Sequence, residues 1–300
     1  MTDEARLKTA MTDIAGHVED TLRALLPGGD GPEARLYEAM AYSALDGGKR
    51  LRPFLAVQSA RLFGVPDRQS LRAGAAIECV HCYSLVHDDL PAMDDDDLRR
   101  GKPTNHIRYD EATAILAGDA LQTLAFEVLA DPATHPDGAI RSALVAELAA
   151  AAGAQGMVGG QMYDLAAEAE GASFDVDQIT ALQRMKTGRL FDVSSQAGAI
   201  LGGADATARA ALAAYTAAMG LAFQIADDIL DETGSADEVG KQVGKDAAAG
   251  KATFISLLGL ENAKERANML ALQASDALEC FGASADLLRS VAHFVVNRRT

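Results

Sequence analysis

The stretch His87-Asp88-Asp89-Leu90-Pro91-Ala92-Met93-Asp94 continues directly into Asp95-Asp96-Asp97-Leu98-Arg99-Arg100-Gly101-Lys102. Six carboxylates within ten residues repel one another, so a folded chain must neutralise them. A solvated acidic loop is the plainest interpretation of such a run. Here apolar residues flank the run and two arginines follow it. Carboxylates and arginines beside an apolar wall favour a divalent cation that bridges to a phosphate.

The residues before this run belong to a long apolar helix, which Pro91 must end or kink. The whole chain is rich in alanine and leucine, with helical spacing of apolar residues and no alternation of period two. No linker is long enough to divide the chain, so we expect a single all-α domain over residues 1–300, a large helical bundle. The expected helices are 3–26, 33–45, 53–63, 68–90, 110–129, 138–169, 175–201, 205–232, 253–260, 262–280 and 284–298.

Composition excludes several classes of function. The net charge of −16 argues against nucleic-acid binding, which needs a basic surface. The first thirty residues lack the apolar core of a signal peptide, and no uninterrupted apolar run approaches the length of a membrane span, so stable membrane insertion is not expected. Three cysteines make a poor disulfide framework, which predicts a cytoplasmic protein. Cys79-Val80-His81-Cys82 has no second ligand pair, so we interpret its thiols as ordinary helical cysteines.

A second acidic cluster occurs in Phe223-Gln224-Ile225-Ala226-Asp227-Asp228-Ile229-Leu230-Asp231. Its three aspartates, at i, i+1 and i+4, fall on one side of a helix. Apolar sequence leads into them, and buried unpaired carboxylates are so costly that metal coordination is the usual remedy. The alternative is an exposed acidic turn ending at Thr233-Gly234, which would put anions at the unfavourable end of the helix dipole.

A third motif is cationic. Gly47-Gly48-Lys49-Arg50-Leu51-Arg52-Pro53 brings three cations to a helix entrance and suggests an anion cradle, although it lacks P-loop spacing. Mg²⁺ takes only one or two carboxylates and completes its shell with water and phosphate oxygens. Two aspartate clusters and scattered cations therefore predict a diphosphate held by several Mg²⁺ ions. Lys186-Thr187-Gly188 matches the K-T-G of penicillin-binding enzymes, but the chain has no S-x-x-K, which excludes that class.

In combination, these motifs resemble those of the trans (E-type) isoprenyl diphosphate synthases, most closely the bacterial short-chain group that makes farnesyl diphosphate. The resemblance rests on Asp-Asp-x-x-x-x-Asp followed by Arg-Arg-Gly, on Phe-Gln-x-x-Asp-Asp-x-x-Asp and on Gly-Gly-Lys-Arg-x-Arg-Pro, and spans about residues 40–255. It implies a helical bundle around a deep cavity, usually a homodimer. It also implies an Mg²⁺-dependent prenyltransferase that joins isopentenyl diphosphate to an allylic diphosphate, dimethylallyl or geranyl, head to tail.

The resemblance also implies roles for individual residues. Three Mg²⁺ ions would be held on the allylic diphosphate by Asp88, Asp94 (with Asp89), Asp227, Asp228 and Asp231. That diphosphate would be contacted by Arg99, Lys186 and Lys241, with Lys251 nearby. The diphosphate of isopentenyl diphosphate would be bound by Lys49, Arg52, His81 and Arg100, with Gly48 permitting its approach. Thr187 and Gln224 would turn oxygen dipoles toward the allylic cation. Asp95, Asp96 and Asp97 are expected to make structural contacts.

Product length is predicted from Tyr83, which lies five residues before Asp88 and so about 7.5 Å deeper along a helix. By resemblance, an aromatic residue here blocks growth at fifteen carbons, which favours farnesyl over geranylgeranyl diphosphate without excluding the longer product. Residues 237–251 are expected to form a flap over the substrate. The terminal Asn297-Arg298-Arg299-Thr300 is expected to be a solvated end, with contact between this tail and the site as the alternative.

Three other classes remain as alternatives. A terpene cyclase would share the helical fold and one aspartate motif, but not both clusters together with a cradle for a second diphosphate. A non-catalytic partner subunit would typically have lost one aspartate cluster. An acidic metal-buffering protein would need neither a cavity nor the arginines.

Overall fold

The computed structural model describes residues 2–45, 47–170, 174–233 and 253–298. Lys241, Lys251 and the expected flap lie outside the described residues, as do Arg299 and Thr300.

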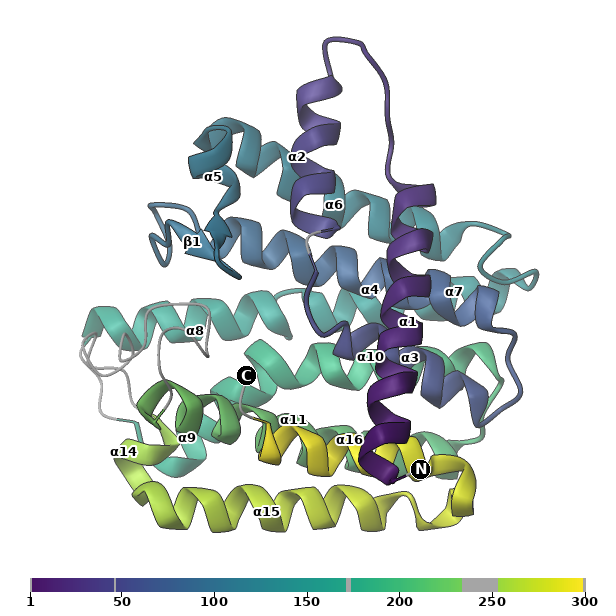
Figure 1. The fold of residues 1–300 in the computed structure, drawn as a ribbon, viewed down its shortest axis with the longest axis vertical. Coiled ribbons are helices and arrows are strands. Elements are labelled where there is room, and N and C mark those ends of the chain that lie inside the picture. Colours follow the sequence, from purple (N-terminus) through teal and green to yellow (C-terminus); the bar gives the residue numbers. More distant parts are fainter. Residues whose placement is uncertain (1, 46, 171–173, 234–252, 299–300) are drawn as a thin grey trace.

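The described chain folds into a helical bundle with one two-residue antiparallel hairpin (Figure 1). This confirms the predicted all-α class. The elements are α1 (Asp3–Leu25), α2 (Ala34–Ala44), α3 (Leu51–Arg61), α4 (Asp67–Asp88), β1 (Leu98–Arg99), β2 (Lys102–Pro103), α5 (Asn105–Arg108), α6 (Glu111–Ala130), α7 (Gly138–Ala152), α8 (Met157–Glu170), α9 (Val176–Gln183), the π-helix η1 (Arg184–Gly188), α10 (Arg189–Leu201), α11 (Ala206–Thr233), α14 (Phe254–Leu258), α15 (Leu260–Ala277), the 3₁₀-helix η2 (Glu279–Ala285) and α16 (Asp286–Asn297).

The core is built around α4 and α10, which run through the middle of the bundle (Figure 1). Every residue of α10 from Val193 to Leu201 is buried, so this helix carries apolar and small residues all round rather than on one stripe. Gly198 brings it very close to α3, because a Cβ at Gly198 would lie 2.4 Å from the Ala60 nitrogen. Outer helices such as α1 instead bury one face, through Leu7, Ile14, Val18 and Leu22.

Two expected helices are interrupted. The stretch predicted as one helix over 138–169 is broken between α7 and α8, and the stretch 175–201 contains the five-residue π-helix η1. Such π-helical turns inside α-helices are frequent at functional sites. The third helix begins at Leu51 rather than Pro53, and its N-cap residue Arg50 has a left-handed backbone with φ 46°.

The expectation that no apolar stretch reaches membrane-spanning length is wrong. By length and composition alone, three helical stretches of the described chain could cross a membrane: Glu111–Ala130, Gly138–Ala167 and Ala206–Thr233. Within the bundle each of them buries residues against other helices, for example Leu121 on α6, Leu144 on α7 and Ile225 on α11.

Candidate active site

The first aspartate cluster lies where α4 ends. The helix stops at Asp88, and the chain folds back so that the Asp94 N–H donates to the Asp88 carbonyl at 2.8 Å. Asp95 adopts a left-handed backbone with φ 50° in this turn. The helix therefore ends before Pro91, as predicted, and the turn that follows brings Asp94 next to Asp88. Burial raises the pKa of Asp88 to about 6, while the nearby Lys186 opposes that shift.

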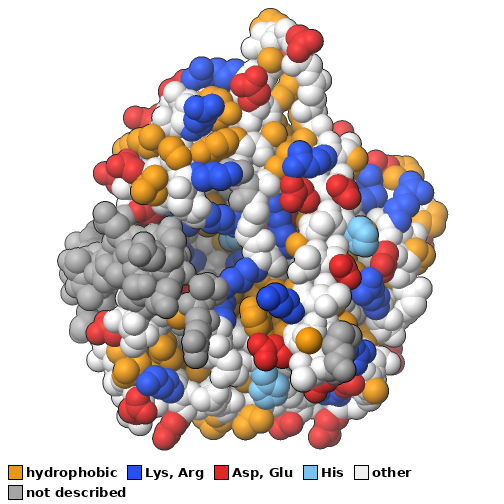
Figure 2. Space-filling model, in the orientation of Figure 1, with side chains coloured by type: hydrophobic (Ala, Val, Ile, Leu, Met, Phe, Trp, Pro, Cys, Tyr) orange, Lys and Arg blue, Asp and Glu red, His pale blue; other side chains and the backbone are white. Residues whose placement is uncertain are grey.

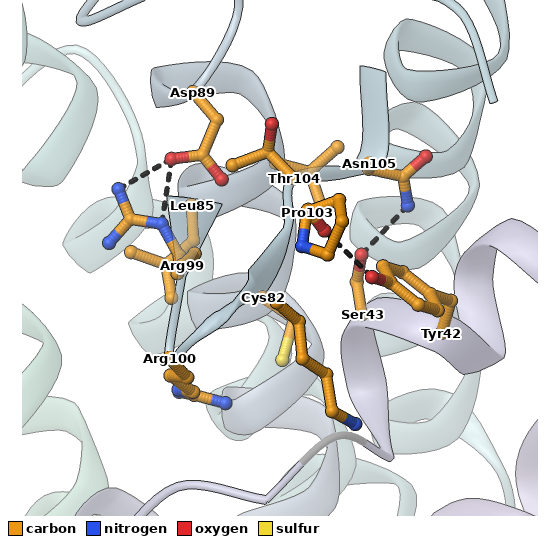
Figure 3. A pocket seen from close by; sticks show the side chains of 12 residues that line it. Tyr42, Ser43, Cys82, Leu85, Asp89, Arg99, Arg100, Pro103, Thr104 and Asn105 are labelled. Atoms are coloured by element: carbon orange, nitrogen blue, oxygen red, sulfur yellow. Dashed lines mark hydrogen bonds and ion pairs between the residues drawn. The ribbon is translucent and has the colours of Figure 1, made fainter. Parts of the chain in front are cut away.

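Asp89 is used differently from Asp88. It is buried, and its Oδ1 accepts from Arg99 Nε at 2.7 Å and pairs with Arg99 Nη2 at 2.5 Å (Figure 3). Asp96 adds a second carboxylate 3.6 Å from the same guanidinium. Asp89 and Asp96 thus hold Arg99, the arginine expected to contact the allylic diphosphate. The pocket beside this pair, at about 50 Å³, has room for a few water molecules.

The second cluster divides in a similar way. The carboxylate of Asp228 is buried, accepting from the Phe254 N–H at 2.8 Å and from Gln224 Nε2 at 3.3 Å. It therefore fixes the start of α14 against α11. Asp227, in contrast, has a side chain that is 45% exposed and forms an ion pair with Arg298. Asp231 is half-buried, one turn further along α11.

The prediction of a solvated C-terminal end is wrong for Arg298. Its side chain is only 3% exposed, and its guanidinium lies over the Phe223 ring at 3.9 Å from the centroid. Phe223 packs edge-to-face on Phe191 at 5.0 Å, and Arg52 covers Phe191 at 4.7 Å. Two guanidinium groups therefore enclose two rings and join Asp227 to the cationic motif. Spacing in the sequence could not indicate where the chain end would dock.

The residues of the cationic motif and its expected partners come together from α3, α4 and the β1–β2 turn. Arg100 donates to the Gly47 carbonyl at 3.0 Å. A Cβ at Gly48, where φ is 95°, would lie 2.8 Å from Arg100 Cζ. In this structure Gly48 admits the guanidinium of Arg100, whereas the resemblance implied that it admits the diphosphate. Figure 2 shows Lys and Arg side chains gathered around a hollow near the middle of one face.

Removal from water lowers the pKa of two groups of this cradle. It lowers the pKa of His81 well below its ordinary value, and the neighbouring Arg52 and Arg100 lower it further, so His81 is a neutral imidazole. Partial desolvation also lowers the pKa of Lys49, although the residue is exposed, and Arg298 adds to the effect. Arg52 carries a buried Nε without a hydrogen-bond partner in the described chain. A buried guanidinium N–H of this kind is suited to donate to an anionic partner.

The π-helix places Lys186 and Thr187 between the two aspartate clusters. Lys186 Nζ donates to Asp164 Oδ2 on α8 at 2.6 Å. Thr187 Oγ1 donates to Gln224 Oε1 on α11 at 3.3 Å. Lys186 also lies close enough to Asp88 to lower its pKa. The three predicted residues Lys186, Thr187 and Gln224 are therefore brought together.

Sequence reasoning missed two residues of α8. Asp164 holds Lys186, and Gln161 has a buried Nε2 with no hydrogen-bond partner among the described residues. The available signal was the Gly159-Gly160-Gln161 run followed by Asp164 one helical turn later. Glycine is needed at position 160, since a Cβ there would lie 2.3 Å from the backbone nitrogen of Lys186.

Tyr83 lies below Asp88, as its spacing predicts. It is buried and makes an edge-to-face contact with His87 at 5.7 Å between ring centroids. His87 Nε2 is 3.0 Å from the Ile115 carbonyl on α6, and a Cβ at Gly118 would meet that nitrogen at 2.1 Å. Tyr83 and His87 therefore form one side of a wall between α4 and α6.

The carboxylates of the site suit Mg²⁺ bound together with a diphosphate rather than a metal ion held by protein groups alone. No group of three His, Cys, Asp or Glu side chains in the described part of the chain converges tightly enough to hold a metal alone. That arrangement fits Mg²⁺ bridged by a diphosphate, because Mg²⁺ takes one or two carboxylates per ion. Asp88, Asp94 and Asp227 are suited to this. Cys79 and Cys82 are buried, and burial raises the pKa of both thiols, which matches the interpretation as ordinary helical cysteines.

Comparisons with known proteins agree with this geometry. The polyprenyl synthetase family model matches residues 33–283. The chain is 46% identical over 268 residues to farnesyl diphosphate synthase of Escherichia coli (strain K12), with 87% of this chain and 88% of that protein covered. An FPP/GFPP synthase from Zymomonas mobilis, in an apo structure, has a TM-score of 0.91 and 49% identity, with 97% of this chain and 99% of that chain covered. A geranyltransferase from Helicobacter pylori, complexed with magnesium and isoprenyl diphosphate, has a TM-score of 0.84 and 33% identity, with 96% and 95% covered.

Proposed function

The chain belongs to the polyprenyl synthetase family, and we propose that it joins isopentenyl diphosphate to dimethylallyl or geranyl diphosphate and makes (2E,6E)-farnesyl diphosphate. It is a prenyltransferase that elongates head to tail. Farnesyl diphosphate synthases that cover most of the chain support the fifteen-carbon product more strongly than a geranylgeranyl product.

One observation carries the proposal: η1 connects the two aspartate clusters. Lys186 lies near Asp88 of α4, and the adjacent Thr187 is hydrogen-bonded to Gln224 of α11, which in turn bonds Asp228. A terpene cyclase or a metal buffer would not need this bridge together with a separate cationic cradle. The bridge suits a reaction in which one diphosphate leaves while a second stays bound.

Magnesium ions held by Asp88, Asp94 and Asp227, three in all as the family implies, would neutralise the leaving diphosphate. The relative that is complexed with magnesium and isoprenyl diphosphate supports this requirement. Asp89 supports the first cluster through Arg99, Asp228 supports the second through α14, and Asp231 would complete the second. Arg99, Lys186, Lys241 and Lys251 would add positive charge at the same diphosphate.

The residues around the reacting carbon make ionisation possible. The allylic C1–O bond breaks and its electron pair leaves with the diphosphate, which is favourable only where preorganised positive charge receives it. Lys186, held by Asp164, supplies such a charge at a fixed position. The oxygens of Thr187 and Gln224 would stabilise the allylic cation that remains. The apolar residues of the surrounding helices keep water away from it.

Lys49, Arg52, Arg100 and the neutral His81 would hold the second substrate by its diphosphate. The double bond of isopentenyl diphosphate then attacks the allylic C1, forming the new C–C bond. A proton leaves the resulting cation, and the released diphosphate is the base that accepts it. No side-chain nucleophile takes part, which agrees with a site built from cations, carboxylates and amide or hydroxyl dipoles.

We further propose that the enzyme works as a cytoplasmic homodimer. The exposed apolar side chains Ile115 and Leu116 on α6, with Ile107 on α5, support a surface that a second copy covers. The whole chain would then act as one isoprenoid synthase domain.

The function is tested by incubating the purified protein with Mg²⁺, geranyl diphosphate and radiolabelled isopentenyl diphosphate, followed by chromatography of the dephosphorylated products. Farnesol is the expected product, and chelation of Mg²⁺ should abolish it. A protein that ionises geranyl diphosphate to monoterpenes without consuming isopentenyl diphosphate would be a cyclase instead.

A further inference from the structure

A fully buried ion pair lies within the cationic motif. Arg50 Nη1 is 2.7 Å from Glu78 Oε1, and the two side chains are 2% and 3% exposed. The other arm of the guanidinium, Nη2, donates to the Ala44 carbonyl at 2.6 Å. One side chain thereby ties the end of α2, the start of α3 and the middle of α4 together.

The backbone of Arg50 is unusual for its residue type. Its φ of 46° and ψ of 38° are left-handed, a conformation that costs an L-residue free energy and that glycine or asparagine would adopt more readily. With this conformation, neighbouring cations of the motif lie in different environments. Arg50 is buried against Glu78, whereas Lys49 is exposed and lies in electrostatic range of Asp227 and Arg298. Glu78 therefore neutralises one of the three cations of the motif.

Stability alone does not account for the pair. Buried ion pairs can commonly be replaced by apolar side chains of similar volume without loss of stability, because desolvation offsets their attraction. Such pairs do fix geometry, since each partner tolerates few positions. The left-handed backbone of Arg50 adds a further cost, so the benefit of the arrangement must lie in what it positions.

The positioned groups are those of the anion cradle. Glu78 lies one helical turn before His81 on α4 and in electrostatic range of Arg52. Lys49 directly precedes Arg50, and Arg52 follows it by two residues. The Arg50–Glu78 pair therefore lies behind Lys49, Arg52 and His81 and links the helices that carry them.

We propose that Glu78, acting through Arg50, is a positioning residue for the second substrate: it sets the geometry in which Lys49, Arg52 and His81 receive the diphosphate of isopentenyl diphosphate. The inference rests on the proposed function. The allylic diphosphate would be held elsewhere, by the end of α4, η1 and α11. Loss of the Arg50–Glu78 pair should therefore weaken the binding of isopentenyl diphosphate and leave the binding of the allylic substrate unchanged.

The test is the double variant Arg50→Met/Glu78→Leu, which replaces the ion pair by apolar side chains. Its matched control is Arg61→Met/Asp67→Leu, because that pair, at 2.7 Å, joins the same α3 and α4 at an exposed position. The KM for isopentenyl diphosphate should rise about tenfold or more in the first variant and stay within about twofold in the control, since a small misplacement of a positioning group is costly. The KM for geranyl diphosphate should be unchanged in both.

A folded double variant with an unchanged KM for isopentenyl diphosphate, or with equal rises for both substrates, would overturn the proposal. The second variant, Glu78→Asp, keeps the charge and shortens the reach. It should bind isopentenyl diphosphate more weakly than the wild type in calorimetry without allylic substrate. Wild-type affinity in Glu78→Asp, or failure of both variants to fold, would mean that the pair is purely structural. A wild-type protein that forms no elongated product would instead refute the proposed function.

Discussion

Arg298, two residues before Thr300, forms an ion pair with Asp227, the first aspartate of the second cluster, while its guanidinium lies over Phe223. The contact places a cation of the protein on a carboxylate that would hold Mg²⁺. Before metal and diphosphate bind, Arg298 therefore neutralises part of the acidic site. Metal ions must compete with it for Asp227.

Replacing Arg298 by glutamine should strengthen divalent-ion binding to the substrate-free enzyme. Loss of one partly exposed competing ion pair corresponds to about 1 kcal/mol, or roughly fivefold in affinity. Mn²⁺ titration followed by electron paramagnetic resonance measures this without turnover. Arg289→Gln, on the helix α16 that Arg298 directly follows, removes an ion pair with Asp286 and should leave Mn²⁺ affinity unchanged. Weaker or unaltered Mn²⁺ binding in Arg298→Gln would show that the two cations do not compete.

Asp88 makes the metal-free enzyme sensitive to pH. Its pKa is raised by burial to about 6, so the folded state holds a proton that the unfolded state releases near 3.8. The stability that this proton contributes is present below pH 3.8 and is lost as pH rises to about 6. Asp88→Asn should therefore stabilise the metal-free protein at pH 7.5 by roughly 1 to 3 kcal/mol while abolishing activity. Urea unfolding of the wild type and of Asp88→Asn at pH 4 and pH 7.5 measures this change in the free energy of unfolding. An equal change at both pH values would contradict a raised pKa of Asp88.

Tyr83 should limit product length. Tyr83→Ala removes the whole buried phenol ring beside His87 and opens the wall between α4 and α6, so products longer than fifteen carbons should appear. Tyr83→Phe keeps the ring and should keep the farnesyl product. Reversed-phase chromatography of the dephosphorylated products separates the lengths. A Tyr83→Ala enzyme that still stops at fifteen carbons would mean that other residues form the floor.

Gly160 should be required for the position of Lys186. A Cβ at Gly160 would lie 2.3 Å from the backbone nitrogen of Lys186, so Gly160→Ala must shift η1. We expect kcat to fall by about a hundredfold, as for other small displacements of a catalytic group. Gly16→Ala on α1 is the control, because a Cβ there meets nothing within 4 Å and should stabilise the helix by about 0.5–1 kcal/mol. Full activity in a folded Gly160→Ala enzyme would remove Lys186 from the mechanism.

Local patterns in the sequence predicted most of the helices. The end of the helix at Asp88 followed from Pro91, and the expectation that Lys186, Thr187 and Gln224 act together followed from the resemblance to the isoprenyl diphosphate synthases. The break between α7 and α8 was missed because alanine-rich sequence continues through it. Its signal was glycine: a Cβ at Gly156 would lie 2.0 Å from the Ala151 carbonyl oxygen.

Long-range pairings could not be predicted in the same way. Arg50 and Glu78 are 28 residues apart, and Arg298 and Asp227 are 71 apart. No periodicity connects such residues, since their contact depends on how whole helices pack. The sequence therefore identified cations and carboxylates of the site without indicating which of them neutralise one another before substrate binds.

The central claim is that two aspartate clusters and a separate cationic cradle act on two diphosphates at once. The most direct test is to follow farnesyl diphosphate formation from geranyl and isopentenyl diphosphates in the wild type and in Asp88→Asn and Asp227→Asn. The account predicts Mg²⁺-dependent farnesyl diphosphate from the wild type and a loss of at least about a thousandfold in each variant, as expected when charge stabilisation of the leaving group is removed. Wild-type rates in either variant, or no elongated prenyl product from the wild type, would contradict it.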